Sequence, residues 1–366
     1  MSETWLRIAD PFGVDLLEYG DFVSLSYARS LNDFSPLRLA LPTSFDRTLL
    51  RKDGRIQVWR QATDGPITLD TETVWFIRRW RDTSSQDGTK LLEVTAYSAS
   101  YLLASRIIAY TAGSAQAVKA APADNMMKAI VRENLGASAG AGRNISAYLS
   151  VQADLSLGVS LSKAFSRRNV LTVLQDISEQ AATAGTPVYF DIVAPTPTTL
   201  EFRTYATVRG TDRGLSSASP LILSEDRGSL SGVELDDDAT EEVTYAYGRG
   251  DGIQENAVIA TASDAARIGS SPFGRRERLQ DAGNTVSATV VLAYAQKALE
   301  EGLPRRTFRA AIVDTPSAAY GRHWFWGDVV AAEHDGITRN CTVEKIQITL
   351  TDTEGERIEA RLEAND

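Results

Sequence analysis

The sequence predicts an α+β fold that is rich in strands, with helices confined to inserted segments. Three observations support this class. Runs that alternate apolar and polar residues, the pattern of a half-buried strand, occupy most of residues 1–98. Two segments with helical spacing follow, and a third lies further along the chain. The alternating pattern then returns over residues 305–366.

Residues 1–98 are predicted to form a small N-terminal β-barrel domain. In "DFVSLSY" the side chains of Val23, Leu25 and Tyr27 share one face, and "PLRLALP" repeats the pattern. Turns at or between such runs are marked by Asp-Gly pairs at positions 53–54, 64–65 and 87–88. Short strands joined by regular turns are typical of a small barrel.

Residues 99–218 are predicted to form an α/β domain with helices near 124–136 and 169–184. The first helix is expected to begin at Asp124, as its N-cap, and to end at Gly136. Both helices carry an apolar stripe that would cover a sheet. The stripes are Met127, Ile130, Val131 and Leu135 in the first helix, and Val170, Val173, Leu174, Ile177 and Ala181 in the second.

Residues 219–250 and 305–366 are predicted to form a second β-barrel domain, and residues 251–304 an inserted loop and helix. The loop is polar and has little periodicity. The helix is expected to end at Gly302, before Pro304. Its predicted stripe is Val291, Tyr294, Ala295, Ala298 and Leu299.

The composition excludes several classes of function. The chain has 366 residues and a formal charge of −10, which disfavours broad electrostatic binding to DNA as its main activity. No apolar run approaches the roughly 20 residues that cross a bilayer, so no transmembrane segment is expected. Cys341 is the single cysteine, so no disulfide framework can form within one chain.

Few residues are available for catalysis. His323 and His334 are the only histidines, and neither lies in a nucleophile motif such as Gly-x-Ser-x-Gly. The acidic run "ELDDDATEE" lacks the spacing of an EF-hand loop and is expected to be a solvated turn rather than a set of catalytic carboxylates. We therefore expect no enzyme activity, no cofactor and no metal site.

The glycine cluster in "YGRGDGIQEN" is predicted to be a structural turn. A P-loop would need Lys followed by Ser or Thr, leading into a helix, and "IQENAVIA" supplies neither. An Arg-Gly-Asp adhesion role rests on three residues alone. We expect Gly248, Gly250 and Gly252 to supply positive φ where a strand leaves its sheet.

Two clusters are candidate interfaces. "GRHWFWGD" holds Trp324, Phe325 and Trp326, which are expected to lie in the core or at a subunit interface, with a sugar-binding platform as the alternative. "FGRRERLQ" holds three arginines that are expected to form a local interface loop, although contacts to nucleic acid are the other interpretation. They are Arg275, Arg276 and Arg278.

The order of elements resembles the baseplate or tail-tip hub proteins of tailed bacteriophages, a group related to the hub domain of tail-associated lysins and to late-control D proteins. The resemblance runs through "LLEVTAYSASYLLASRII", "NVLTVLQDISEQAATAG" with "TPVYFDI", the strand and glycine cluster "VTYAYGRGDG", and "HWFWGDVV". It implies a virion protein at the distal tail tip, made in the host cytoplasm. Each subunit would have two small β-barrel-like domains with helical and α/β insertions.

The same resemblance implies partners. A homotrimer would form a ring that joins a sixfold tail to a threefold tip, and DNA would pass through its channel without sequence-specific binding. The expected neighbours are the distal tail protein ring, the tape-measure protein, and tail fibre or spike proteins. Many relatives continue into a fibre or a lytic domain, for which the end "ERIEARLEAND" leaves no room.

Two other functions stay open at this point. A carbohydrate- or receptor-binding tail module would use Trp324 and Trp326. A glycoside or peptidoglycan hydrolase would use the acidic residues, although their spacing gives it no support.

Overall fold

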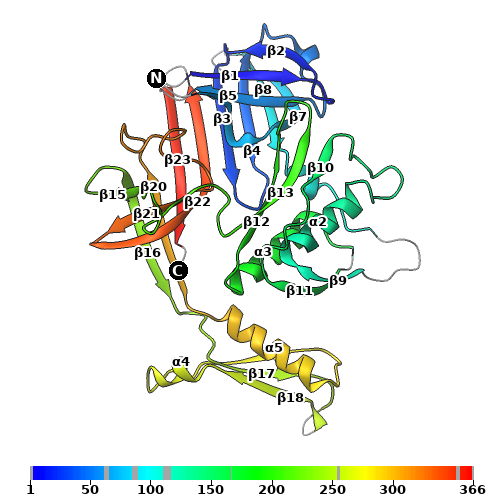
Figure 1. Cartoon of the computed structure of the whole chain (residues 1–366), viewed down its shortest axis with the longest axis vertical. Coiled ribbons are helices and arrows are strands. Elements are labelled where there is room, and N and C mark those ends of the chain that lie inside the picture. The colour runs from blue at the N-terminus through cyan, green and yellow to red at the C-terminus, as the bar shows by residue number, and fades with distance from the viewer. Residues whose placement is uncertain are drawn as a thin grey trace. The chain divides into compact units, whose positions relative to one another are not determined.

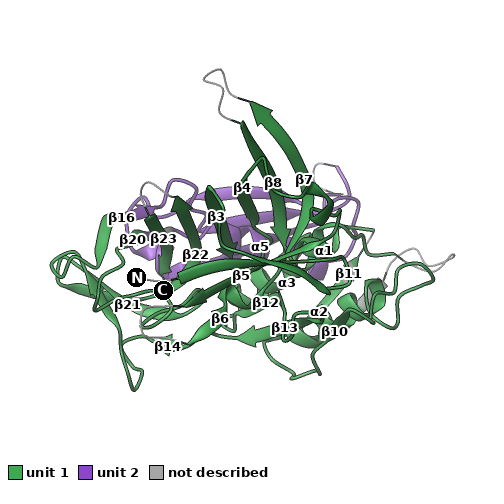
Figure 2. Cartoon of the chain, turned by 90° about the horizontal axis from the view of Figure 1, so that it is seen from above, with its two compact units in different colours: residues 1–233, 309–366 green, residues 234–308 purple. Residues whose placement is uncertain are grey.

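The computed structural model describes residues 3–61, 66–84, 90–109, 117–165, 167–253, 256–351 and 355–364. They form two compact units (Figure 2). Unit 1 comprises residues 1–233 and 309–366, and unit 2 comprises residues 234–308. The chain leaves unit 1 within strand β16 (Leu230–Asp238) and returns within β20 (Arg305–Ile312), so unit 2 is an insertion in the sequence of unit 1.

Unit 1 is built on a sheet in which 15 strands of the described residues take part. The main path is β16-β20-β23-β22-β3-β4-β8-β7-β5-β1-β2, and β6, β14, β15 and β21 branch from it. Besides β16 and β20, the strands are β1 (Glu3–Ala9), β2 (Asp15–Tyr19), β3 (Ser24–Ser30), β4 (Pro36–Pro42), β5 (Arg55–Gln61), β6 (Ile67–Leu69), β7 (Trp75–Ser84), β8 (Lys90–Ser98), β14 (Asp212–Arg213), β15 (Ile222–Ser224), β21 (Val329–His334), β22 (Ile337–Thr351) and β23 (Gly355–Ala364).

The large sheet joins the two ends of the chain. N-terminal β3 pairs antiparallel with C-terminal β22, and Tyr27 lies opposite Ile348 (Figure 1). The strands predicted for two separate barrels therefore share one sheet, and the sheets of the described residues are not closed barrels. The strand-rich α+β class is confirmed, whereas two barrel-like domains stay a prediction.

Alternation of side chains explains the core on one face of this sheet. In β4 the side chains of Leu37, Leu39 and Leu41 are buried, as are those of Leu25 and Tyr27 in β3. Apolar residues at every second position point to the same face of a strand, so burying that face removes all of them from water. The predicted Asp53-Gly54 turn is observed before β5, and the pairs at 64–65 and 87–88 lie outside the described residues.

The rest of unit 1 is an α/β region. Its two long helices are α2 (Ala123–Asn134) and α3 (Val170–Thr183), which correspond to the two predicted helices. They share a core cluster with the three-stranded sheet β10-β13-β12. The other elements here, with two short 3-10 turns, are β9 (Ala117–Pro122), α1 (Tyr101–Ala104), β10 (Leu149–Val151), β11 (Ser160–Phe165), β12 (Val188–Val193), β13 (Leu200–Ala206), η1 (Arg47–Leu49) and η2 (Asp70–Glu72).

The predicted start of α2 is wrong by two residues. Pro122 occupies the N-cap position, and Asp124 lies inside the first turn with its side chain buried. Its carboxylate accepts hydrogen bonds from Lys128 Nζ (2.9 Å) and from the backbone N–H of Leu155 (3.0 Å). An acidic residue in the first turn suits the helix dipole, but here it also ties α2 to the following loop.

Unit 2 is a three-stranded sheet covered on one face by a helix. The sheet has the order β18-β17-β19, made of β17 (Tyr245–Arg249), β18 (Ile259–Ser263) and β19 (Glu277–Asp281). Helices α4 (Ala265–Gly269) and α5 (Ala288–Glu301) complete it. Of the predicted α5 stripe, Val291, Ala295 and Ala298 are buried, but Tyr294 is exposed and its assignment was wrong.

The predicted grouping of residues 219–250 with 305–366 spans both units. Strands β15 and β16 take part in the large sheet, whereas β17 pairs with β18 and β19 in the small one. The predicted insertion 251–304 lies wholly within unit 2.

Candidate functional site

The tryptophans of the predicted interface cluster lie in the interior of unit 1. Trp324 is fully buried and Trp326 is 3% exposed. Each indole N–H is satisfied: Trp324 donates to the carbonyl of Ala318 (2.8 Å) and Trp326 to that of Glu344 (3.2 Å). Phe325 between them is 41% exposed. The two indoles are thus core residues, and they offer no stacking surface to a sugar.

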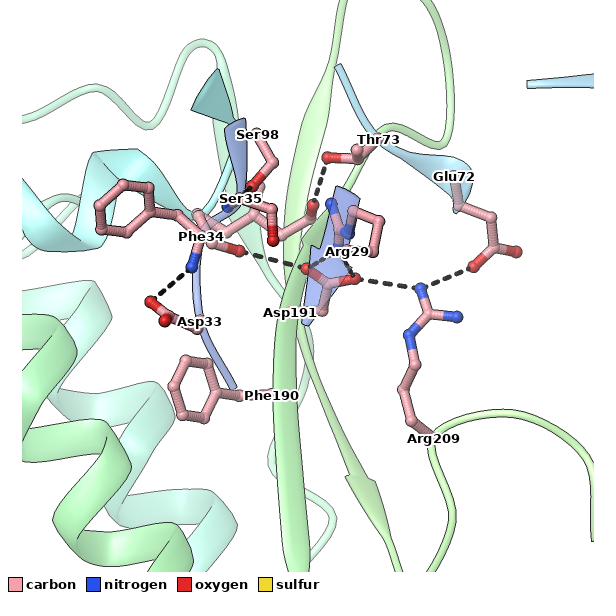
Figure 3. A network of polar contacts seen from close by, with 12 residues as sticks. Arg29, Asp33, Phe34, Ser35, Glu72, Thr73, Ser98, Phe190, Asp191 and Arg209 are labelled. Atoms are coloured by element: carbon pink, nitrogen blue, oxygen red, sulfur yellow. Dashed lines mark hydrogen bonds and ion pairs between the residues drawn. The ribbon is translucent and has the colours of Figure 1, made fainter. Parts of the chain in front are cut away.

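Trp326 packs against two arginines. The guanidinium of Arg29 lies 4.4 Å from its ring centroid and that of Arg209 lies 4.1 Å away. Both arginines bind Asp191 on β12 (Figure 3). Arg29, from β3, donates to the two carboxylate oxygens at 2.6 and 2.7 Å, while Arg209 donates at 3.0 Å. Arg209 also reaches Glu72 at 3.1 Å.

This network is buried and not fully satisfied. Arg29 is completely buried, and its Nε and Nη1 atoms have no hydrogen-bond partner among the described residues. Burial lowers the pKa of Arg29, and the attraction of Asp191 opposes that effect. For Arg209 burial also lowers the pKa, but the combined effect of Asp191, Tyr205 and Glu72 is larger and the net shift is upward. Asp191 therefore compensates two buried cations where the large sheet meets the α/β region.

Asp70, two residues before Glu72, is a second buried carboxylate. Asp70 accepts hydrogen bonds from the hydroxyls of Tyr27 (2.7 Å) and Tyr320 (3.0 Å). Burial raises the pKa of Asp70, and the hydrogen bond from Tyr27 opposes the rise. Arg60 packs over the Tyr320 ring and binds both carboxylate oxygens of Glu356 at 2.9 and 2.7 Å. These contacts connect strands from both ends of the chain.

The 3-10 turn η2 links the two networks through a strained backbone. Asp70 at its start belongs to the second network and Glu72 at its end to the first. Thr71 and Glu72 both have φ of 54°, a conformation that costs of order 1–3 kcal/mol for residues other than glycine. The carbonyl of Glu72 accepts from Ala194 N–H at 2.7 Å, which fixes the turn against the end of β12.

Sequence reasoning missed these networks. One signal was present for Arg29, because it continues the face of Leu25 and Tyr27 in β3 and therefore had to point into the core. Asp70 and Asp191 have no such signal, since their partners come from distant segments. Every carboxylate here is held by donors from the chain itself, so the arrangement is suited to fixing segments together rather than to acid–base chemistry.

The three predicted interface arginines lie in unit 2, at and before β19. Arg275 lies 3.8 Å from the Tyr245 ring centroid and binds Glu277 at 2.5 Å. Arg276 donates to the carbonyl of Phe273 at 2.6 Å, and Arg278 lies 3.7 Å from Glu241. Their charges are thus engaged within unit 2, while Phe273 beside them is 75% exposed.

The glycine cluster serves close packing at all three of its positions. Gly252 alone has positive φ, 105°. At Gly248, inside β17, an added Cβ would collide with the carbonyl oxygen of Val291 on α5, and at Gly250 with that of Thr285. The prediction of positive φ is therefore wrong for Gly248 and Gly250, where the missing side chain lets α5 approach the sheet.

The remaining candidate residues are the acidic run and the two histidines. The acidic run begins in β16, and residues 234–238 of this strand are exposed. His323 Nδ1 accepts from Ala319 N–H at 3.0 Å, and His334 Nδ1 lies 2.8 Å from Glu225. Among the described residues no group of three or more His, Cys, Asp or Glu side chains could hold a metal ion. None of the helices described is long and apolar enough to cross a membrane.

Comparisons with known proteins place this fold among tail proteins. The model of the family described as Siphovirus ReqiPepy6 Gp37-like protein matches residues 16–362. A tail protein from Neisseria meningitidis is similar in structure, with a TM-score of 0.57, 14% identity, and coverage of 99% of this chain and 96% of its own. No curated protein matches the sequence.

Two prophage proteins have the same fold. The 43 kDa tail protein of prophage MuSo2 from Shewanella oneidensis has a TM-score of 0.58 and 11% identity, covering 100% of this chain and 99% of its own. Prophage tail protein gp18 from Listeria monocytogenes has a TM-score of 0.54 and 11% identity, covering 98% and 94%.

Proposed function

The chain belongs to the family of siphovirus ReqiPepy6 Gp37-like proteins, and on this premise we propose that it is a structural protein of a bacteriophage tail, located at the tail tip or baseplate. The observation that carries the proposal is the extent of the family match, residues 16–362, which includes residues of both units. The fold shared with three tail proteins, two of them from prophages, agrees with it.

Within the tail, the role that fits best is that of the hub. A hub must hold its shape while it joins other proteins, and unit 1 is cross-connected by pairing of β3 with β22 and by buried ion networks. The proposed assembly is a homotrimeric ring around a channel through which DNA passes. Each subunit would contribute two barrel-like domains to this ring.

The surface of unit 2 is rich in exposed hydrophobic side chains, which is typical of a surface that another protein covers after assembly. It carries nine of the twenty exposed large hydrophobic side chains of the described residues, which mark interaction sites when they gather. They are Leu235, Ile253, Ile259, Phe273, Leu279, Val286, Val290, Tyr294 and Leu303. The proposed partners are a second copy of the chain, the distal tail protein ring, the tape-measure protein, and fibre or spike proteins.

The test is imaging of the purified full chain by negative-stain electron microscopy, with mass determined on the same sample. Threefold rings with a central hole and the mass of three 39.8 kDa chains are expected. Because rings could need a neighbour, the second sample contains the distal tail protein of the same phage. A monomer in both samples, over a range of protein concentrations, contradicts the hub role.

A further inference from the structure

The large sheet has a polar face opposite its core, and a groove crosses five strands of that face. Its volume is about 660 Å³. It runs over β22, β3, β4, β8 and β7, and its wall combines hydroxyl groups with guanidinium groups. The side chains that matter for recognition are Ser26, Arg38, Arg79, Arg81, Thr95 and Thr349.

Strand register places these side chains in a row. Thr349 lies opposite Ser26, Ser26 opposite Arg38, Arg38 opposite Thr95, and Thr95 opposite Arg79. Because neighbouring strands are about 4.8 Å apart, Arg38 and Arg79 emerge about 10 Å from each other, with the Thr95 hydroxyl between them. Arg81 follows Arg79 on the same face of β7, about 7 Å along the strand.

A β-bulge creates the arginine pair on β7. Ile77 lies opposite Ala96, but Arg79 rather than Arg78 lies opposite Thr95, so one extra residue enters β7 between them. A bulge turns the following side chains to the other face. Arg79 and Arg81 thereby face the groove, whereas Arg78 forms an ion pair with Asp53.

The groove carries positive charge that the chain does not neutralise. Among the described residues neither Arg38 nor Arg79 forms an ion pair or a side-chain hydrogen bond. Arg81 binds Glu93 at 2.6 Å, and that glutamate is the acidic residue in the lining. Although the whole chain has a charge of −10, salt screens charges beyond about 8 Å, so the local excess governs what binds here.

The chemistry of the lining selects a phosphate backbone. Guanidinium groups with Ser and Thr hydroxyls are the side chains that contact phosphate oxygens in protein–DNA complexes. The lining contains no aromatic ring on which an unpaired base would stack, which disfavours single strands. A peptide that binds by strand addition would need an unpaired strand edge, and the groove floor is the face of a sheet whose backbone is already paired.

We propose that this groove binds the phosphate backbone of double-stranded DNA without regard to base sequence, through Arg38, Arg79 and Arg81. The contact is weak because it consists of a few charge pairs, and it depends on salt because each pair releases counterions from the DNA. Such a contact would hold or guide DNA at the protein surface without arresting it. It does not require the trimeric ring, so it can be tested on the full chain in any oligomeric state.

The experiment measures fluorescence anisotropy of two labelled DNA duplexes of unrelated sequence with the full-length protein and two double variants. Arg38→Gln/Arg79→Gln removes the two unpaired guanidiniums. Arg132→Gln/Arg168→Gln is the matched control, because it removes the same charge from exposed residues outside the groove that pair with Asp154 and Asp176. Equal thermal unfolding of the three proteins establishes that they are folded.

The native protein is expected to bind both duplexes equally. With three phosphate contacts its affinity should fall about 40-fold between about 50 mM and about 200 mM salt, and with one contact, in the groove variant, about 4-fold. The control should behave as the native protein does. The proposal is overturned if no duplex binds at low salt, if both variants lose binding equally, or if polyglutamate binds as tightly as DNA.

Imaging of the same groove variant separates this inference from the proposed function. A variant that still forms threefold rings but has lost DNA binding supports both. Rings formed by a native protein that binds no DNA would reject the groove proposal alone.

Discussion

At the scale of single residues, buried charge is what connects segments that are distant in sequence. Asp191 on β12 binds Arg29 from β3 and Arg209 from beyond β13, and both arginines pack against the ring of Trp326. A buried ion pair adds little stability compared with apolar packing, but removing one partner leaves an uncompensated charge inside the protein. Asp191 has two such charges to compensate, and the α/β region is fixed to the large sheet through it.

This makes Asp191→Asn the most informative single change. The free energy of unfolding should fall by about 3 to 5 kcal/mol, the usual effect of breaking a buried pair, because Arg29 cannot reach water. Urea denaturation of the full chain measures it. The matched control is Asp154→Asn, which breaks an exposed pair with Arg132 and should cost less than about 1 kcal/mol. Equal losses in the two variants would show that Asp191 has no special role.

At the scale of elements, periodicity predicted the helices and the central strands but not every strand. Helices α2 and α3 agree closely with the predicted ranges, because apolar residues at helical spacing form a single stripe only when the segment is a helix. Strand β9 shows no alternating pattern because of its alanines, and it is held by pairing with β11, some forty positions away. Pairing between distant segments is a tertiary effect that local pattern does not record.

The glycines of β17 show the same limit and lead to a second prediction. Gly248→Ala should push α5 away from the small sheet, because its Cβ would meet the backbone of Val291 and backbone cannot rotate aside. Overpacking of this kind costs about 1 to 3 kcal/mol. Hydrogen–deuterium exchange should therefore be faster in α5 than in the native chain, with unit 1 unchanged.

Gly269→Ala supplies the control in the same unit. An added Cβ at Gly269, at the end of α4, has no heavy atom within 4 Å, so exchange in α5 should stay at the native rate. If hydrogen–deuterium exchange in α5 is equally fast in the two alanine variants, Gly248 is not needed for the close approach of α5 to the sheet.

At the scale of the whole molecule, the sequence located the strand-rich regions but not their union in one sheet. The pairing of β3 with β22 joins residues more than 300 positions apart, and no local pattern specifies such a partner. The candidate site was affected likewise. The sequence left both the core and a subunit interface open for Trp324 and Trp326, and the structure buries both in the core. For Trp326 no local pattern could decide this, because Arg29 and the carbonyl of Glu344 come from other segments.

Unit 2 differs from unit 1 in how much core it has, and this difference predicts how each behaves alone. The core cluster of unit 2 consists of Val243, Ala246, Ala295 and Ala298, three of which are alanines. A domain of this size needs a substantial apolar core, since burial must offset the conformational entropy lost on folding. Residues 234–308 expressed alone should therefore lack a cooperative thermal transition by circular dichroism and show poorly dispersed amide signals by NMR.

Unit 1 provides the comparison for that experiment. A chain in which a short Gly-Ser linker joins residue 233 to residue 309 keeps the large sheet and the core around α2 and α3, so it should unfold cooperatively. If residues 234–308 fold cooperatively on their own, unit 2 is stable without a partner that covers its exposed side chains. If they fold only when a tail partner is added, the partner that restores the dispersed NMR spectrum is the one that covers them.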